Sequence, residues 1–279
     1  MKRIALVAII LALVAAACGD DDSAAEGPFP ADAFAFAASS DLAVGTERLL
    51  VAVAGVNGER LASPDVPVAL KMYPQEDPSS AQEPPVRFMW AIEGVSGLYA
   101  TTVEFDRAGI WLVELTPQGG EAMEEFPVTV LPEATTIGVG EPAPLSDTPT
   151  AADRPLEEIT SDPEPDPDLY RLSVADAVTD GRPTVIAFAT PAFCQTAICG
   201  PTLERVKEIA PDHPDVDFVH VEVYTNLDDP DNLEVVPAIV EWGLPTEPWI
   251  FVVDAAGIVT HRFEGLVTAE ELDAALGSS

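Results

Sequence analysis

The stretch that decides the fold of the C-terminal half reads FATPAFCQTAICGPTL over residues 188–203. It joins an apolar run at residues 184–189 to a segment with helical apolar spacing at residues 202–210, and Cys194 and Cys199 lie between the two. A thiol at the start of a helix ionises readily, because unpaired backbone N–H groups and the helix dipole stabilise the reactive thiolate. The stretch therefore predicts a strand–loop–helix unit that carries a reactive cysteine pair.

The spacing of the pair restricts where the helix can begin. On an unbroken helix, residues five apart have Cα atoms about 8–9 Å apart that point in different directions. A disulfide needs Cα atoms within about 7 Å, so either Cys194 precedes the helix or the first turn unwinds on oxidation. Pro201 fits a first turn but not a helix interior. We therefore expect a helix that begins near Gly200, with Cys194 as the attacking thiol and Cys199 as the resolving thiol, both in the preceding loop.

Outward from this unit, the chain alternates between helical and strand patterns. The apolar periodicity predicts further strands over residues 216–224, 249–253 and 258–263, and helices over residues 172–178, 232–242 and 268–276. Pro237 weakens the second of these helices, and Thr268 with Glu271 forms a capping box at the start of the last. A βαβ unit followed by a hairpin and a closing helix predicts an α/β domain.

This order of elements resembles that of the thioredoxin superfamily. The segment GLPTEPWIFVVD at residues 243–254, followed by Gly257, is similar to the P-x-x-F-x-x-D-x-x-G segment of periplasmic TlpA-like thioredoxins. The resemblance covers residues 135–277 and implies that Pro248 is the cis-proline whose loop packs against the redox cysteines, with Pro245 as the competing position. Thioredoxins carry C-x-x-C, however, whereas this chain has C-x4-C.

A C-x4-C pair followed by glycine also resembles peroxiredoxins of the bacterioferritin-comigratory type. In those enzymes the first cysteine attacks peroxide and the second resolves the sulfenate. Their Pro-x-x-x-Thr-x-x-Cys pocket is not reproduced here, because Ala187 and Pro191 stand seven and three positions before Cys194. Peroxidase activity therefore remains a secondary alternative.

The stretch around Ile198 and Cys199 is similar to that of Sco-type copper chaperones, which use a later histidine as a third copper ligand. Residues 242–249 contain no histidine, so copper binding is disfavoured. Zinc is disfavoured because four suitable ligands do not cluster in the sequence. We therefore expect neither a metal nor a cofactor.

Residues 41–132 have a different pattern, in which short β-branched and aromatic runs are separated by turn signals. The stretch from Gly97 to Trp111 resembles small bacterial extracytoplasmic sandwiches, whose aromatic side chains fill the core between two sheets. We expect an antiparallel, immunoglobulin-like β-sandwich with no chemistry of its own. Its strands are predicted over residues 48–56, 68–73, 86–92, 98–105, 110–115 and 126–131.

The first residues predict a secretory signal. A positively charged start precedes an unbroken apolar run over residues 4–17, which is shorter than the roughly 20 residues that span a bilayer. Residues 14–19, VAAACG, resemble a bacterial lipobox, which implies cleavage and lipid attachment at Cys18. The alternative is an ordinary signal peptide with an incidental cysteine. Lipidation of Cys18 would leave two of the three cysteines as a pair in an oxidising compartment.

Composition divides the rest of the chain. Residues 19–40, rich in Ala, Asp and Ser, and residues 133–170, rich in Pro and acidic residues, predict linkers, the second an extended connector. The predicted division is thus a signal at 1–18, a linker at 19–40, a sandwich at 41–132, a linker at 133–170 and a thioredoxin-like domain at 171–279.

The formal charge of −35 disfavours nucleic acid and anionic headgroups as partners. It fits an acidic solvated surface, with a specific cationic partner as the alternative.

The function that these features favour is that of an extracytoplasmic thiol–disulfide oxidoreductase, anchored to the cell membrane through Cys18 or else secreted. It would act on protein thiols or disulfides, or on a redox partner, through a mixed-disulfide or sulfenate intermediate. The competing interpretation is a non-catalytic binding or scaffold protein with a structural Cys194–Cys199 disulfide. A loop this short closes little chain entropy, which weighs against a purely structural bridge.

Overall fold

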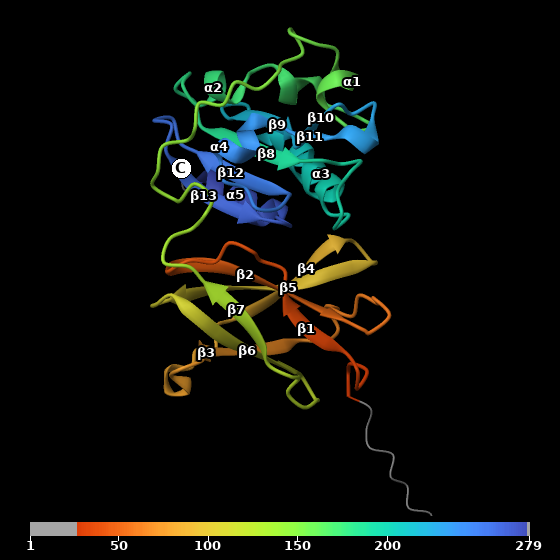
Figure 1. The fold of residues 1–279 in the computed structure, drawn as a ribbon, viewed down its shortest axis with the longest axis vertical. Coiled ribbons are helices and arrows are strands. Elements are labelled where there is room, and N and C mark those ends of the chain that lie inside the picture. Colours follow the sequence, from red (N-terminus) through yellow and green to blue (C-terminus); the bar gives the residue numbers. More distant parts are fainter. Residues whose placement is uncertain (1–26, 278–279) are drawn as a thin grey trace, which may run out of the picture.

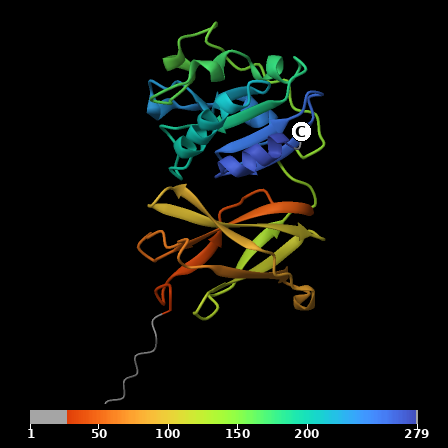
Figure 2. The same ribbon diagram turned by 180° about the vertical axis from the view of Figure 1, so that it is seen from behind.

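The computed structural model describes residues 27–277. These residues form two lobes stacked along the long axis of the molecule (Figures 1 and 2). We call residues 27–131 the N-terminal lobe and residues 132–277 the C-terminal lobe. Cys18 and the predicted signal lie outside the described residues. Over the described range, no helix is both long enough and apolar enough to cross a membrane.

The N-terminal lobe consists of two antiparallel sheets. One has the strand order β1-β2-β5-β4 and the other β3-β6-β7. All six predicted strands are present, and β4 has the predicted bounds. The elements are β1 (Phe34–Ala37), β2 (Gly45–Ala54), β3 (Val68–Pro74), the short 3-10 helix η1 (Pro78–Ser80), β4 (Val86–Ile92), β5 (Ser96–Phe105), β6 (Gly109–Pro117) and β7 (Phe126–Val130).

Both sheets turn alternate side chains into one shared core. Tyr99, Val103 and Phe105 come from β5, and Trp111 meets them from β6. The rings of Phe105 and Trp111 pack edge to face with centroids 5.0 Å apart. The aromatic side chains therefore fill the space between the sheets, as predicted. The immunoglobulin-like character of this arrangement stays a prediction.

Strand β1 lies inside the predicted linker at residues 19–40, so the structure differs from that prediction. Phe34 to Ala37 pair with Ala54 to Val51 of β2 in an antiparallel register. Ala35 points into the core between the exposed side chains of Phe34 and Phe36. Four residues are too few for a clear alternating pattern, and the strand forms because the edge of β2 offers backbone partners.

The C-terminal lobe is built on a four-stranded sheet with the order β13-β12-β8-β9. Strands β8 and β9 are parallel and the other pairs are antiparallel. Strands β8 and β12 have the predicted bounds. The elements are α1 (Leu156–Ile159), η2 (Pro167–Tyr170), α2 (Val174–Ala177), β8 (Thr184–Ala189), α3 (Cys199–Ile209), η3 (Ala210–Asp212), β9 (Asp217–Glu222), β10 (Tyr224–Thr225), η4 (Pro230–Asn232), β11 (Glu234–Val235), α4 (Pro237–Glu241), β12 (Trp249–Val253), β13 (Val259–Glu264) and α5 (Ala269–Gly277).

Helices cover both faces of this sheet, which is why β8 is apolar and buried along its whole length. Helices α2 and α4 pack on the face that carries Ile186 and Phe188. Helices α3 and α5 pack on the face that carries Val185 and Ala187. The helix predicted over residues 232–242 is confined to α4, because a proline without an N–H group can begin a helix but not continue one.

The segment 133–170 is not the extended connector that its composition predicts. Its buried side chains include Ile159, Leu169 and Tyr170, which join the core beneath the sheet. Its backbone also bonds to β13, since Gly140 N donates to Val259 O at 2.8 Å. A few well-placed apolar residues are enough to anchor the segment, although prolines and acids dominate its composition.

The lobes meet through a small apolar cluster and two arginines. Leu50, Met89, Ala91 and Ala100 of the N-terminal lobe pack against Leu266, with Ile198 at the edge. Arg48 of β2 donates to Leu266 O at 2.6 Å and pairs with Glu271 of α5 at 2.9 Å. Because Ile198 directly precedes Cys199, the N-terminal lobe lies against one flank of the cysteine loop.

The second arginine, Arg262 of β13, pairs with Asp41 at 2.9 Å and with Glu47 at 2.5 Å. Thr135 and Thr136 donate further hydrogen bonds to the Asp41 carboxylate.

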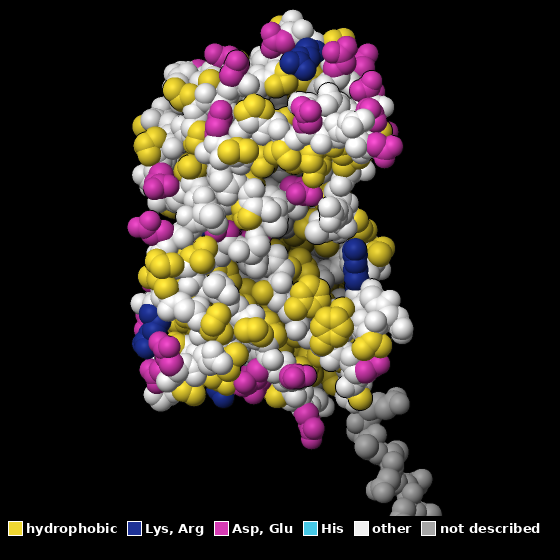
Figure 3. All heavy atoms as spheres, in the orientation of Figure 1, with side chains coloured by type: hydrophobic (Ala, Val, Ile, Leu, Met, Phe, Trp, Pro, Cys, Tyr) yellow, Lys and Arg dark blue, Asp and Glu magenta, His cyan; other side chains and the backbone are white. Residues whose placement is uncertain are grey.

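The remaining acidic side chains lie mostly on the surface, where Figure 3 shows them scattered over both lobes with far fewer lysines and arginines. That distribution fits the predicted acidic solvated surface.

Candidate functional site: the cysteine loop

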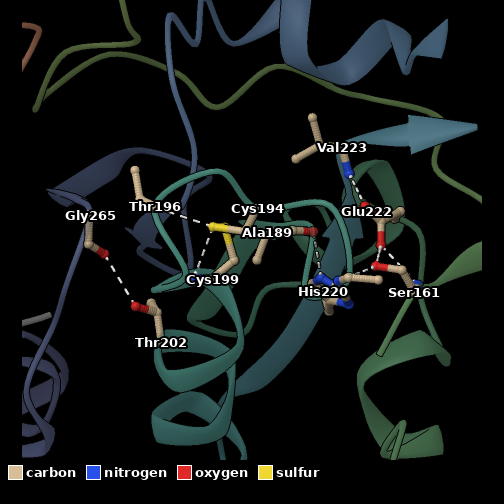
Figure 4. The surroundings of a disulfide bond; sticks show 11 residues. Ser161, Ala189, Cys194, Thr196, Cys199, Thr202, His220, Glu222, Val223 and Gly265 are labelled. Atoms are coloured by element: carbon tan, nitrogen blue, oxygen red, sulfur yellow. Dashed lines mark hydrogen bonds between the residues drawn. A yellow bond between two sulfur atoms is a disulfide. The ribbon is translucent and has the colours of Figure 1, made fainter. Parts of the chain in front are cut away.

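Cys194 and Cys199 form a disulfide at the junction of loop and helix (Figure 4). Their Cα atoms are 5.9 Å apart, within the range that a disulfide requires. Cys199 is the first residue of α3 and Cys194 lies in the preceding loop, which confirms that Cys194 precedes the helix. The helix begins one residue before the predicted Gly200, so the prediction that Cys199 also lies in the loop is wrong. Cys199 is fully buried, whereas Cys194 is partly exposed. An incoming thiolate can therefore reach only the sulfur of Cys194 directly.

Tight turns fold the loop back over the start of the helix. Phe193 N donates to Thr190 O at 3.3 Å, and Ala197 N donates to Cys194 O at 3.4 Å. Ala197 has a φ of 61°, in the left-handed region, which costs a residue with a Cβ atom roughly 1–2 kcal/mol. The loop is thus held in a strained conformation that places Cys194 next to the backbone of Cys199.

Two groups surround the sulfur of Cys194. The backbone N–H of Cys199 donates to Cys194 Sγ at 3.3 Å, and Thr196 Oγ1 lies 3.3 Å from the same sulfur (Figure 4). The N–H belongs to the first turn of α3, where the helix dipole also favours negative charge. After the disulfide opens, these groups would stabilise a thiolate at Cys194.

The other side of the loop is held through hydrogen bonds to two distant segments, residues 133–170 and strand β9. Ala192 N donates to Ser161 Oγ at 3.1 Å, and Ser161 donates in turn to the carboxylate of Glu222 at the end of β9 (Figure 4). The neighbouring His220 is buried between Tyr170 Oη at 2.7 Å and Ala189 O at 3.0 Å. Burial lowers the pKa of His220 and so disfavours its charged form.

The Glu247–Pro248 peptide bond is cis, which confirms the conformation predicted for Pro248. Among the described residues it is the only cis bond, so Pro245 is excluded from that position. The proline also lies beside the site, since a carboxylate oxygen of Glu247, directly before it, lies within 4.8 Å of both sulfurs. Its catalytic role stays a prediction.

Glu247 is the functional candidate that the sequence analysis missed. A carboxylate oxygen of Glu247 and the sulfurs of Cys194 and Cys199 all lie within 4.8 Å of one another. Burial and the negative charge of Glu222 raise the pKa of Glu247. Within residues 27–277 its carboxylate makes no hydrogen bond or ion pair. Its place directly before the predicted cis-proline was the one signal in the sequence that could have identified it.

Comparisons with known proteins find only distant likenesses. No protein-family model and no curated protein matches the chain. The solved structures that resemble it include DsbF of Mycobacterium tuberculosis (21% identity, 37% of this chain and 84% of that one, TM-score 0.31). They also include a secreted M. tuberculosis disulfide oxidoreductase homologous to E. coli DsbE (16% identity, 38% of this chain and 87% of that one, TM-score 0.31). A third is the exposed lipoprotein thioredoxin Etrx1 of Streptococcus pneumoniae (18% identity, 36% of this chain and 86% of that one, TM-score 0.28). TM-scores this low carry no weight, so the function is argued from the geometry of this chain.

Proposed function

We propose that this chain is a thiol–disulfide oxidoreductase that exchanges the Cys194–Cys199 disulfide with the thiols or disulfides of protein clients. The observation that carries the proposal is the asymmetry of the pair. Cys194 is reachable and lies against the N-terminus of α3, while Cys199 is buried as the first residue of that helix. An exchanging pair requires one accessible sulfur and one protected sulfur to resolve it.

The reaction follows from this asymmetry. A client thiolate attacks Cys194 Sγ, the Cys194–Cys199 bond breaks, and Cys199 leaves as a thiolate that takes up a proton. The second client thiolate then attacks the client sulfur of the mixed disulfide and releases Cys194 as a thiolate, which the Cys199 N–H and Thr196 stabilise. The client loses two electrons and two protons, and the protein gains them. The same steps in reverse reduce a client disulfide.

The location that we propose is outside the cytoplasm, with an anchor in the cell membrane. The positively charged start, the apolar run at residues 4–17 and the lipobox-like VAAACG around Cys18 support export and lipidation. We further propose that the N-terminal lobe is an immunoglobulin-like domain, divided from the thioredoxin-like domain near residue 132. A disulfide at the active site is consistent with an oxidising compartment.

Two cysteine variants test the proposed exchange reaction. Cys199→Ser should trap a client on Cys194 as a stable mixed disulfide, because the resolving thiol is absent. Cys194→Ser should trap nothing, because the remaining thiol is buried. The measurement is turnover of a protein disulfide such as insulin, together with mass spectrometry of the trapped species.

The competing interpretation, in which the Cys194–Cys199 disulfide is only structural, predicts a different result. Structural disulfides usually have reduction potentials below about −300 mV. A potential in that range, together with absence of turnover and of trapping, would show that the bridge only holds the loop. The peroxidase alternative requires rapid oxidation of the reduced protein by hydrogen peroxide, and stopped-flow measurement of a slow reaction would eliminate it.

A further inference from the structure

The three groups at the centre of the site are also potential metal ligands. The sulfurs of Cys194 and Cys199 and a carboxylate oxygen of Glu247 come from the loop, from α3 and from the segment before β12. From the sequence we expected no metal, because residues 242–249 contain no histidine and four suitable ligands do not cluster. The third group is instead a carboxylate, which the fold brings to the pair from a position close to Pro248.

The distances are suited to a small cation. In protein zinc sites, Zn–S is about 2.3 Å and Zn–O about 2.0–2.2 Å, so neighbouring ligand atoms of a tetrahedral ion lie about 3.3–3.8 Å apart. Here all three atoms already lie within 4.8 Å of one another while the sulfurs are bonded. Reduction removes that bond, and a side-chain movement of about an ångström would bring the three atoms to the spacing of a tetrahedral site.

The charge around the pair also favours a cation. Glu222 stands close enough that its negative charge acts on Glu247. Several nearby cations are already engaged in ion pairs. Arg262 pairs with Asp41 and Glu47, Lys207 pairs with Asp162, and Arg48 of the N-terminal lobe pairs with Glu271. Two thiolates beside Glu247 would therefore concentrate negative charge that no ion pair among the described residues neutralises.

We propose that reduced Cys194 and Cys199, together with Glu247, bind Zn²⁺ or a similar thiophilic divalent cation, with water in the fourth position. Two thiolates and one carboxylate are ligands that zinc accepts, and three protein ligands leave one coordination position open. The inference rests on the proposed function in one respect, which is that the disulfide can be reduced in the folded protein.

Binding would depend on the redox state of the pair. An external dithiol supplies two electrons and two protons to the disulfide and becomes a disulfide itself. The cation then displaces the two thiol protons to form the dithiolate site. In the oxidised protein both sulfurs are bonded to each other and only Glu247 remains as a ligand. A bound cation would thus protect the reduced pair from alkylation and from reoxidation.

The test is a titration of the full chain with Zn²⁺, in competition with a chromophoric chelator. The protein is reduced with a phosphine, which is removed under anaerobic conditions, and the oxidised protein serves as a control that should not compete. Cd²⁺ added to the reduced protein should produce the ultraviolet thiolate-to-metal charge-transfer band. Cys194→Ser and Cys199→Ser should each abolish both signals, because one remaining thiolate cannot form the site.

Variants of Glu247 identify the third ligand. Loss of even an outer-shell partner commonly weakens metal binding by about 10- to 100-fold, so Glu247→Gln should weaken Zn²⁺ binding by at least about tenfold. Glu247→Asp, which keeps the carboxylate, should retain most of the affinity. Glu208→Gln removes the same charge from an exposed position on α3 and should leave the affinity unchanged. Circular dichroism of each oxidised variant checks that it is folded.

Several results would overturn the inference. Equal Zn²⁺ affinity in the wild type and in Glu247→Gln would remove Glu247 from the site. Failure of the reduced wild type to bind Zn²⁺ or Cd²⁺ would remove the site entirely. Insulin turnover measured in the presence of a chelator separates the two proposals, because intact turnover without metal binding refutes only this inference. A disulfide that cannot be reduced in the folded protein would refute both.

Discussion

Two regions of the molecule hold carboxylates away from solvent, the contact between the lobes and the surroundings of the cysteine pair. At the lobe contact three carboxylates are paired with a cation: Asp41 and Glu47 pair with Arg262, and Glu271 pairs with Arg48. At the cysteine pair, Glu222 is held by Ser161 and by Val223 N. Glu247 has no such partner within the described residues.

The difference shows which of the two regions is built for stability. Burial raises the pKa of Asp41, but hydrogen bonds from Thr135 and Thr136 outweigh it and hold this pKa below its usual value. Burial raises the pKa of Glu247, and the charge of Glu222 raises it further. A charge that is withdrawn from solvent without a partner costs stability, which fits the metal-ligand role that we propose for Glu247.

Removal of the cation from the lobe contact should have the largest effect. Arg262→Ala leaves Asp41 buried without its positive partner, and breaking a buried pair in this way typically costs about 3–5 kcal/mol. The measurement is the free energy of unfolding in guanidinium chloride. Arg171→Ala is the matched control, because Arg171 pairs with Asp168 at an exposed site and its loss should cost less than about 1 kcal/mol. Equal losses in the two variants would contradict the role assigned to the lobe contact.

Removal of the acidic partner should have a smaller effect that depends on pH. The pKa of Asp41 is lowered in the folded protein, so its stabilising contribution is present above the unfolded pKa and is lost as pH falls through the folded pKa. Asp41→Asn should therefore reduce the free energy of unfolding at neutral pH by about 1–3 kcal/mol. Below about pH 4, near the ordinary value of 3.8, the difference from the wild type should shrink.

A substitution that relieves the strained backbone of the cysteine loop should increase stability instead of reducing it. Ala197 has a φ of 61°, which glycine adopts without a Cβ penalty. Ala197→Gly should therefore stabilise the oxidised protein by up to about 1 kcal/mol, although the greater freedom of glycine in the unfolded chain reduces the gain. Thermal unfolding measures the change. A lower melting temperature in Ala197→Gly would show that the loop is not strained at this position.

The smallest effect is expected at the unpaired carboxylate. Glu247→Gln removes a half-buried charge that no cation neutralises, so the oxidised variant should be slightly more stable than the wild type at neutral pH. Asp41→Asn, which removes a carboxylate that Arg262 does neutralise and whose pKa is lowered in the folded protein, should have the opposite effect. If both variants change the melting temperature in the same direction, the contrast between the two regions does not hold.

Much of the C-terminal lobe could be predicted because its signals are local. The bounds of β8 and β12 follow from short apolar runs that end at Thr190 and Asp254. The position of Cys194 before α3 follows from the five-residue spacing and from Pro201. The capping box is present as predicted, since Thr268 and Glu271 exchange hydrogen bonds of 3.0 and 3.2 Å. Each of these features depends on residues that are close in sequence.

Other features depend on contacts that no local pattern encodes. Strand β1 forms because β2 has a free edge, and the segment 133–170 folds onto the C-terminal lobe because a few of its apolar residues find a core there. Arg262 and Asp41 are 221 residues apart in the chain. The linker-like composition of residues 19–40 and 133–170 therefore did not reveal that parts of them pair with β2 or pack into a core.

The sequence by itself indicated the cysteine pair and its place at a helix start, because backbone chemistry and apolar periodicity act over a few residues. The resemblance to TlpA-like thioredoxins implied the cis-proline. Only the tertiary structure decided that Cys194 is the reachable sulfur and that Glu247 lies beside both sulfurs. It also decided that the N-terminal lobe covers one flank of the loop through Ile198. These three facts arise from the packing of segments that are distant in sequence, and burial and charge at the site depend on that packing.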